Sequence, residues 1–129
     1  VWNPLFSRWP KWSESYIYTL IPEKGGRVAY WSNIKSLYAT LNVSLCKRAD
    51  LNLTYHRLGA FHDLAQMSSL QMGAGTVRGD LFIFKSTFQL HSRLSGHILY
   101  ERFAPGSFYR DDAANYGWFR VEFLYNFRK

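Results

Sequence analysis

Apolar and polar side chains alternate along the last patterned stretch of the chain, Gly117–Phe127. One set of alternate positions holds Phe119, Val121, Phe123, Tyr125 and Phe127, and the other holds Trp118, Arg120, Glu122, Leu124 and Asn126. Successive side chains of a β-strand point to opposite faces, so this alternation predicts a strand. Its 11 residues match the ~9–11 residues that a tilted strand needs to cross a bilayer, whereas strands of soluble domains average ~5–6.

The same alternation recurs earlier in the chain and predicts further strands of similar kind. These are a weaker one at Glu14–Ile21 and clearer ones at Lys35–Cys46, Leu51–Gly59, Asp80–His91 and Gly96–Ala104. In Asp80–His91 the apolar positions are Phe82, Phe84, Phe88 and Leu90, and the opposite positions are Lys85, Thr87, Gln89 and His91. The two shorter strands are less regular because Arg57 and Arg102 fall among their apolar positions, near one end.

The predicted connections alternate between short and long. Lys47–Asp50 and Ser92–Ser95 are tight turns, whereas Pro22–Ile34, Ala60–Gly79 and Pro105–Tyr116 are long. In a sheet of sequential antiparallel strands, short and long connections then lie at opposite ends. Outer-membrane barrels have this asymmetry, with short periplasmic turns and longer outer loops, so we expect the C-terminus on the periplasmic side.

Together these patterns predict an all-β fold: an antiparallel, up-and-down wall of a transmembrane β-barrel with about six strands. No linker divides residues 1–129, so we treat them as one barrel segment with 117–127 as its closing strand. The smallest outer-membrane barrels have ~8 strands, so we expect the C-terminal part of a larger barrel. A soluble ligand-binding barrel is the alternative, because it is also built from alternating strands.

Composition changes this picture in two respects. Aromatic residues make up 19% and hydrophobic residues 47% of the chain, yet no run of apolar residues is long enough for a transmembrane helix. The formal charge is +7, but Lys and Arg are dispersed and no nucleic-acid-binding motif occurs, so we expect no nucleic acid as partner. The excess of cations indicates either a solvated basic surface or a basic lumen that attracts anions.

Catalytic and metal-binding motifs are missing from the sequence. His62–Asp63 and Asp111–Asp112 lie in long connections, where such residues commonly form turns, and neither GxSxG nor HExxH occurs. Cys46 is the single cysteine, and His91 and His97 flank a tight turn across from each other without a further ligand. We therefore expect no enzyme activity, no cofactor and no metal.

Several stretches resemble the C-terminal part of the alginate export family of outer-membrane proteins. They are Asn3–Phe6, Arg8–Glu14, Tyr30–Asn33, Gly96–Phe103, Pro105–Tyr109, Ala113–Asn115 and Trp118–Phe123. The resemblance implies a location in the bacterial outer membrane and a large barrel that passes an anionic polysaccharide through an arginine-rich lumen. This chain is much shorter than such a barrel, so its partners would be lipid, the solute and the remaining strands.

Strand alternation also selects the residues expected to face the lumen. These are Arg120, Lys85, His56 and His91, with Glu122 close to Arg120. Basic side chains there would attract carboxylates, and neighbouring acids would keep binding weak enough for release. The same residues would equally suit a ladder of structural ion pairs between strands. The expected function is a porin-like channel for an anionic, uronate-type polysaccharide, and the alternative is a structural wall within a larger assembly.

Overall fold

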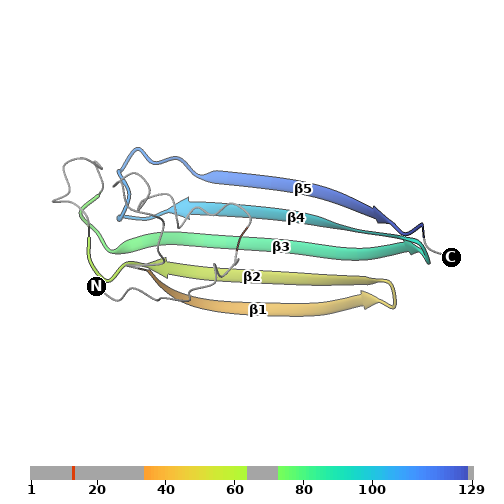
Figure 1. Cartoon of the computed structure of the whole chain (residues 1–129). Coiled ribbons are helices and arrows are strands. Elements are labelled where there is room, and N and C mark those ends of the chain that lie inside the picture. The colour runs from red at the N-terminus through yellow and green to blue at the C-terminus, as the bar shows by residue number, and fades with distance from the viewer. Residues whose placement is uncertain (1–12, 14–33, 64–72, 128–129) are drawn as a thin grey trace, which may run out of the picture.

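The chain folds into a single open β-sheet. The computed structural model describes residue 13, residues 34–63 and residues 73–127, and these contain strands and no helix. The strands are β1 (Lys35–Cys46), β2 (Ala49–Gly59), β3 (Val77–His91), β4 (Leu94–Pro105) and β5 (Tyr116–Tyr125). Each pairs antiparallel with the next, so the spatial order equals the chain order (Figure 1). The described residues contain no helix that is long and apolar enough to cross a membrane.

The predicted all-β, antiparallel architecture is confirmed. β1 has the predicted bounds, and the other strands differ from prediction by at most three residues at either end. The strands run closer to the tight turns than expected because bulges near Ser44 and Gln89 absorb residues that would otherwise lengthen the turns. The remaining predicted strand, Glu14–Ile21, lies outside the described residues.

Short and long connections lie at opposite ends of the sheet. Lys47–Arg48 and Ser92–Arg93 form the tight turns at one end, which we call the turn end. Residues 60–76 and 106–115 connect strands at the other, the loop end, and β5 finishes at the turn end (Figure 1). Near the loop end Gly79 adopts a φ of 135°, and its Cα faces the carbonyl oxygen of Ala104. A side chain at this position would strain the backbone and clash with β4.

The register divides the side chains of the sheet between two faces. Residues directly opposite each other in antiparallel strands point to the same face. One row across the sheet is therefore Leu41, Leu53, Phe84, Tyr100 and Phe119, and the next row, on the opposite face, is Asn42, Asn52, Lys85, Leu99 and Arg120. We call the face of the first row the apolar face and the face of the second the mixed face.

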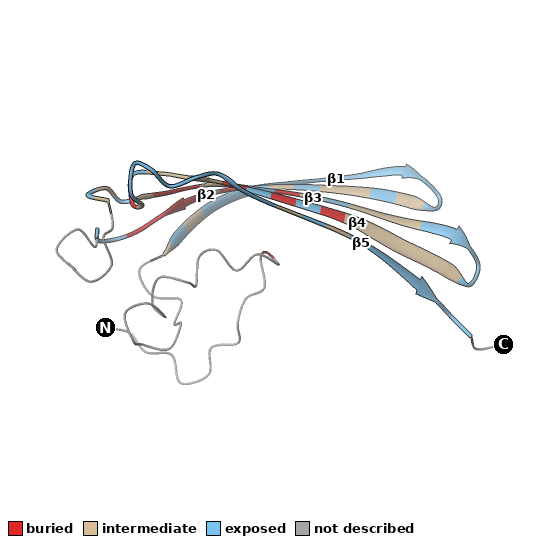
Figure 2. Cartoon of the chain, turned by 90° about the horizontal axis from the view of Figure 1, so that it is seen from above, coloured by how far each residue is buried: buried red, intermediate tan, exposed pale blue. Residues whose placement is uncertain are grey.

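The buried core occupies the half of the mixed face nearer the loop end. Its members are apolar residues of β2, β3 and β4: Leu58, Leu81, Ile83, Leu99 and Phe103. Tyr109, from the connection after β4, and Trp118 pack against them. Figure 2 shows the buried stretches gathered toward the loop end and the middle of the sheet, whereas the turn end has none.

A buried carboxylate lies beside this core. Glu101 is buried, and the Ser13 hydroxyl donates a 2.6 Å hydrogen bond to its Oε2 atom. Ser13 is itself buried, although it precedes the first strand by many residues. In the loop-end half of the mixed face the middle strands are thus buried while the edge residues Tyr38 and Tyr116 stay exposed, and the turn-end half is open.

Candidate functional site

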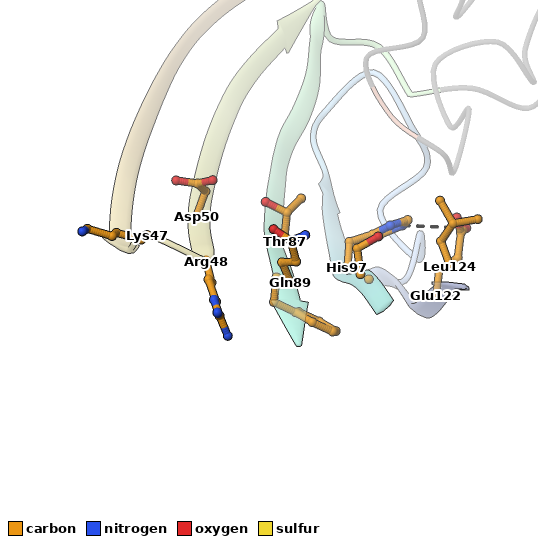
Figure 3. A pocket seen from close by; sticks show the side chains of 11 residues that line it. Lys47, Arg48, Asp50, Thr87, Gln89, His97, Glu122 and Leu124 are labelled. Atoms are coloured by element: carbon orange, nitrogen blue, oxygen red, sulfur yellow. Dashed lines mark ion pairs between the residues drawn. The ribbon is translucent and has the colours of Figure 1, made fainter. Parts of the chain in front are cut away.

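Polar side chains from all the strands line up on the open half of the mixed face. One row consists of Ser44, Asp50, Thr87, His97 and Glu122, and the row before it contributes Asn42, Asn52, Lys85 and Arg120. We call these residues the polar patch. Figure 3 shows Asp50, Thr87, His97 and Glu122 placed side by side on successive strands. The alternation of each strand sends these side chains to one face, and the antiparallel register brings them into line.

The β4–β5 side of the polar patch is a cluster around Arg120. Its Nη2 atom lies 3.0 Å from Nε2 of His97, and its Nε atom lies 3.7 Å from Oε2 of Glu122. The Glu122 oxygen is also 3.9 Å from Nε2 of His97 (Figure 3). The guanidinium carbon lies 5.5 Å from the ring centroid of Trp118. Arg120 is therefore held in place by its neighbours and is only partly exposed.

The β1–β2 side of the patch is a ladder of hydroxyl and amide groups. The Ser44 hydroxyl donates a 2.7 Å hydrogen bond to Oδ1 of Asp50, and Nδ2 of Asn52 donates to Oδ1 of Asn42. One row further, the hydroxyls of Thr40 and Thr54 are 3.1 Å apart. Such cross-strand pairs align polar groups along a sheet, and Asp50 is the charged member of this ladder. Their remaining donors and acceptors suit a ligand rich in hydroxyl groups.

Lys85 lies between these two groups, near the middle of the patch. It is exposed, and no side chain among the described residues forms a hydrogen bond or ion pair with it. An open hollow of about 530 Å³ extends beside it, lined also by Asp50, Asn52 and Thr87. A second hollow of about 360 Å³ lies next to His97 and Glu122, toward the turns. The patch thus combines an available ammonium group with room for a ligand.

The polar patch has no formal net charge. Lys85 and Arg120 balance Asp50 and Glu122 when His97 is neutral. Further cations of the described chain lie in the tight turns, at Lys47–Arg48 and Arg93. The patch contains as many acidic as cationic side chains. Any preference of this surface for anions therefore depends on where the cations lie.

The expected lumen residues fall into two groups. Arg120, Glu122 and Lys85 lie together in the polar patch, as strand alternation predicts. His56 shares their face but is 5% exposed; its Nδ1 atom is 3.0 Å from the Ser36 hydroxyl, and its ring stacks on Tyr38. Its surroundings are those of a structural residue beside the core.

His91 lies apart from the polar patch, at the turn end of β3. The bulge after Gln89 sets it opposite Leu94, and its Nδ1 atom is 3.3 Å from the Ser92 hydroxyl. The expectation that His91 lies across from His97 is wrong, because His97 pairs with Thr87. Within the described ranges, no three His, Cys, Asp or Glu side chains gather closely enough to hold a metal ion.

Sequence reasoning missed His97, Asp50 and the pair Asn42–Asn52 as members of the patch. The signal was available, because a tight turn fixes the register of the hairpin it closes. Counting outward from Lys47–Arg48 places Asn42 opposite Asn52, and counting from Ser92–Arg93 places Thr87 near His97. The bulges make such a count uncertain by one residue, which is enough to move a side chain to the other face.

Comparison with known proteins adds no relative: no protein-family model, curated protein or solved structure matches the chain.

Proposed function

We propose that this chain forms part of the wall of an outer-membrane β-barrel, with its apolar face toward lipid and its mixed face toward the lumen. The observation that carries the proposal is the exposure of large apolar side chains on the apolar face of every described strand. Leu41, Val43, Leu53, Phe82, Tyr100, Phe119, Val121 and Phe123 are all more than a third exposed. An apolar surface this continuous is unusual in a soluble monomer and marks contact with lipid or another apolar surface.

The height of the apolar face also fits a membrane. At ~3.4 Å per residue, Phe82 and Leu90 are ~27 Å apart along β3, or ~20 Å along the membrane normal at a tilt of ~40°. The lipid-facing band of outer-membrane barrels is ~25 Å tall. Arg102 lies in the row of Phe82, and the next row toward the loop end carries Asp80 and Arg57, so the band ends in charged residues.

The polar patch supports passage of an anionic solute, for which a uronate-type polysaccharide is the substrate class we propose. Lys85 and Arg120 provide cations for carboxylates, and the row of amides and hydroxyls suits sugar hydroxyls. Asp50 and Glu122 lie beside these cations and would keep binding weak enough for release. The resemblance to the alginate export family agrees with this solute, with an outer-membrane location and with remaining strands outside this chain.

The test is single-channel conductance of the complete barrel that contains this chain, in a planar bilayer with and without an added oligouronate. The proposal predicts a steady anion-selective current that the oligouronate blocks. Lys85→Ala should weaken the block several-fold, whereas Arg93→Ala, a matched loss of charge in a turn, should leave it unchanged. A current that is indifferent to the oligouronate would exclude the polysaccharide as solute.

A wall that conducts nothing is the second candidate. It is favoured by the core on the loop-end half of the mixed face, where Leu81 and Phe103 are buried and therefore do not line an open lumen. In that case the same experiment would show insertion into the bilayer without any current.

A further inference from the structure

Cationic side chains gather where the apolar face meets the loop end. Lys35 of β1, Arg57 of β2 and Arg102 of β4 all lie on this face and are exposed. Asp80 of β3 is the acidic residue among them, opposite Arg57. Three cations and one carboxylate leave this group, which we call the basic rim, with a formal charge of +2.

Arg57 is oriented by its neighbours while remaining half exposed. Its Nη1 atom lies 2.6 Å from Oδ2 of Asp80, and the hydroxyl of Tyr55 donates a 2.6 Å hydrogen bond to Oδ1 of the same carboxylate. A guanidinium carries ~5 N–H donors, and the pairing with Asp80 uses only part of them. The exposed donors therefore point from a fixed position toward whatever lies against the apolar face.

A hollow of about 300 Å³ opens beside Arg57. Its lining is mostly apolar and includes Leu37 and Val77, and Lys35 and Arg57 are the cations that border it. The stem of Lys35 lies across Gly59, which has no side chain to displace it, and its ammonium group is 5.9 Å from the ring centroid of Phe61. An apolar hollow bordered by cations complements an acyl chain joined to an anionic headgroup.

We propose that the basic rim binds the phosphate headgroup of a membrane lipid, with part of an acyl chain in the hollow between Leu37 and Val77. The inference rests on the proposed function, because only a lipid-facing apolar face meets such a ligand. Arg57 and Asp80 lie one row beyond Phe82, where the apolar band ends. A headgroup bound there would sit at the depth at which the headgroups of the proposed membrane begin. Arginine binds phosphate through paired hydrogen bonds, and lysine adds a mobile point charge.

The experiment is native mass spectrometry of the full chain released from detergent micelles that contain either phosphatidic acid or phosphatidylcholine with the same acyl chains. The wild-type chain should retain phosphatidic acid in preference. The double variant Lys35→Gln/Arg57→Gln should retain several-fold less phosphatidic acid and unchanged phosphatidylcholine. The control Lys47→Gln/Arg48→Gln removes the same charge at the turn end and should behave as the wild type.

Equal losses in the two double variants, or no preference for phosphatidic acid, would overturn the inference. Displacement of the lipid by excess inorganic phosphate would identify a site for phosphate alone and would overturn the lipid assignment. Protease protection in phosphatidylcholine vesicles separates this outcome from failure of the proposed function. A chain that inserts but lacks the lipid preference contradicts the basic rim alone, whereas a chain that does not insert contradicts both proposals.

Discussion

Leu99 and Tyr100 are consecutive residues of β4, yet Leu99 is 5% exposed and Tyr100 is 42% exposed. Leu99 points to the mixed face and joins the core with Leu81, whereas Tyr100 points to the apolar face beside Phe119. The sheet therefore has two apolar surfaces, of which the chain covers one and leaves the other open. Folding of this chain alone accounts for the covered surface, and the proposed contact with lipid would cover the open one.

Placing a charge on the apolar face tests that environment. Val43→Arg puts a cation near the middle of the apolar band, and in a bilayer this should lower the free energy of unfolding by ~2–4 kcal/mol. Asn42→Arg, the adjacent position on the mixed face, should cost less than ~1 kcal/mol, because surface substitutions are usually mild. Urea unfolding of the chain in lipid vesicles measures both. Equal effects would mean that the apolar face does not contact lipid.

Truncating a side chain of the buried core should lower the free energy of unfolding, whether or not the chain is in lipid. Leu81→Ala removes a fully buried side chain from the middle of the core, and such substitutions cost ~2–5 kcal/mol. Leu124→Ala, on the mixed face but exposed at the turn end, should cost much less. The midpoints of urea unfolding followed by tryptophan fluorescence compare the two variants. A mild effect of Leu81→Ala would show that the core is loosely packed.

Gly79 and Gly117 make a matched pair for backbone strain. Gly79→Ala forces a side chain into a positive φ and against the carbonyl of Ala104, so we expect a loss of ~1–3 kcal/mol. At Gly117 the nearest atom to an added Cβ is the Tyr100 hydroxyl at 3.8 Å, an ordinary contact. Gly117→Ala should therefore be neutral or slightly stabilising in thermal unfolding. A destabilised Gly117→Ala with an intact Gly79→Ala would contradict the register near the loop end.

Charge reversal at Lys85 tests which face lines the lumen. Lys85→Glu changes the local charge of the formally neutral patch by two units and should move the reversal potential under a salt gradient toward cation selectivity. Lys35→Glu makes the same change on the apolar face and should leave the reversal potential almost unchanged. If Lys35→Glu has the larger effect, the two faces are assigned the wrong way round.

The edges of the sheet predict how the isolated chain behaves. Within the described residues, β1 and β5 each pair with a strand on one side only, so each presents a row of backbone groups to a further strand. Such edges associate readily. Sedimentation velocity of the purified chain should show oligomers that grow with concentration, and a stable monomer in water without detergent would contradict the expectation.

The strands could be predicted from the sequence, but the buried part of the mixed face could not. Alternation in Lys35–Cys46 is strict, and β1 has those bounds. In β3 the run Leu81–Phe84 is apolar at every position, which is typical of a strand covered on both faces. That run was the signal for the buried core, and it also explains why His56, directly opposite Leu81, is buried. Burial depends on what covers a face, and alternation alone does not report it.

The strands have the same order in the sheet as in the chain, and this order affects how fast the sheet folds. Among these described strands each contact joins neighbours in sequence. The tight turns at Lys47–Arg48 and Ser92–Arg93 can close their hairpins on a timescale of ~1–10 μs. Contacts within these two hairpins favour fast folding, whereas the β2–β3 pairing joins residues far apart in the chain, such as Ala49 and Phe88, and forms more slowly. The hairpins should therefore assemble early, and any step that joins β1 or β5 to a strand beyond this sheet should determine the rate at which a complete wall forms.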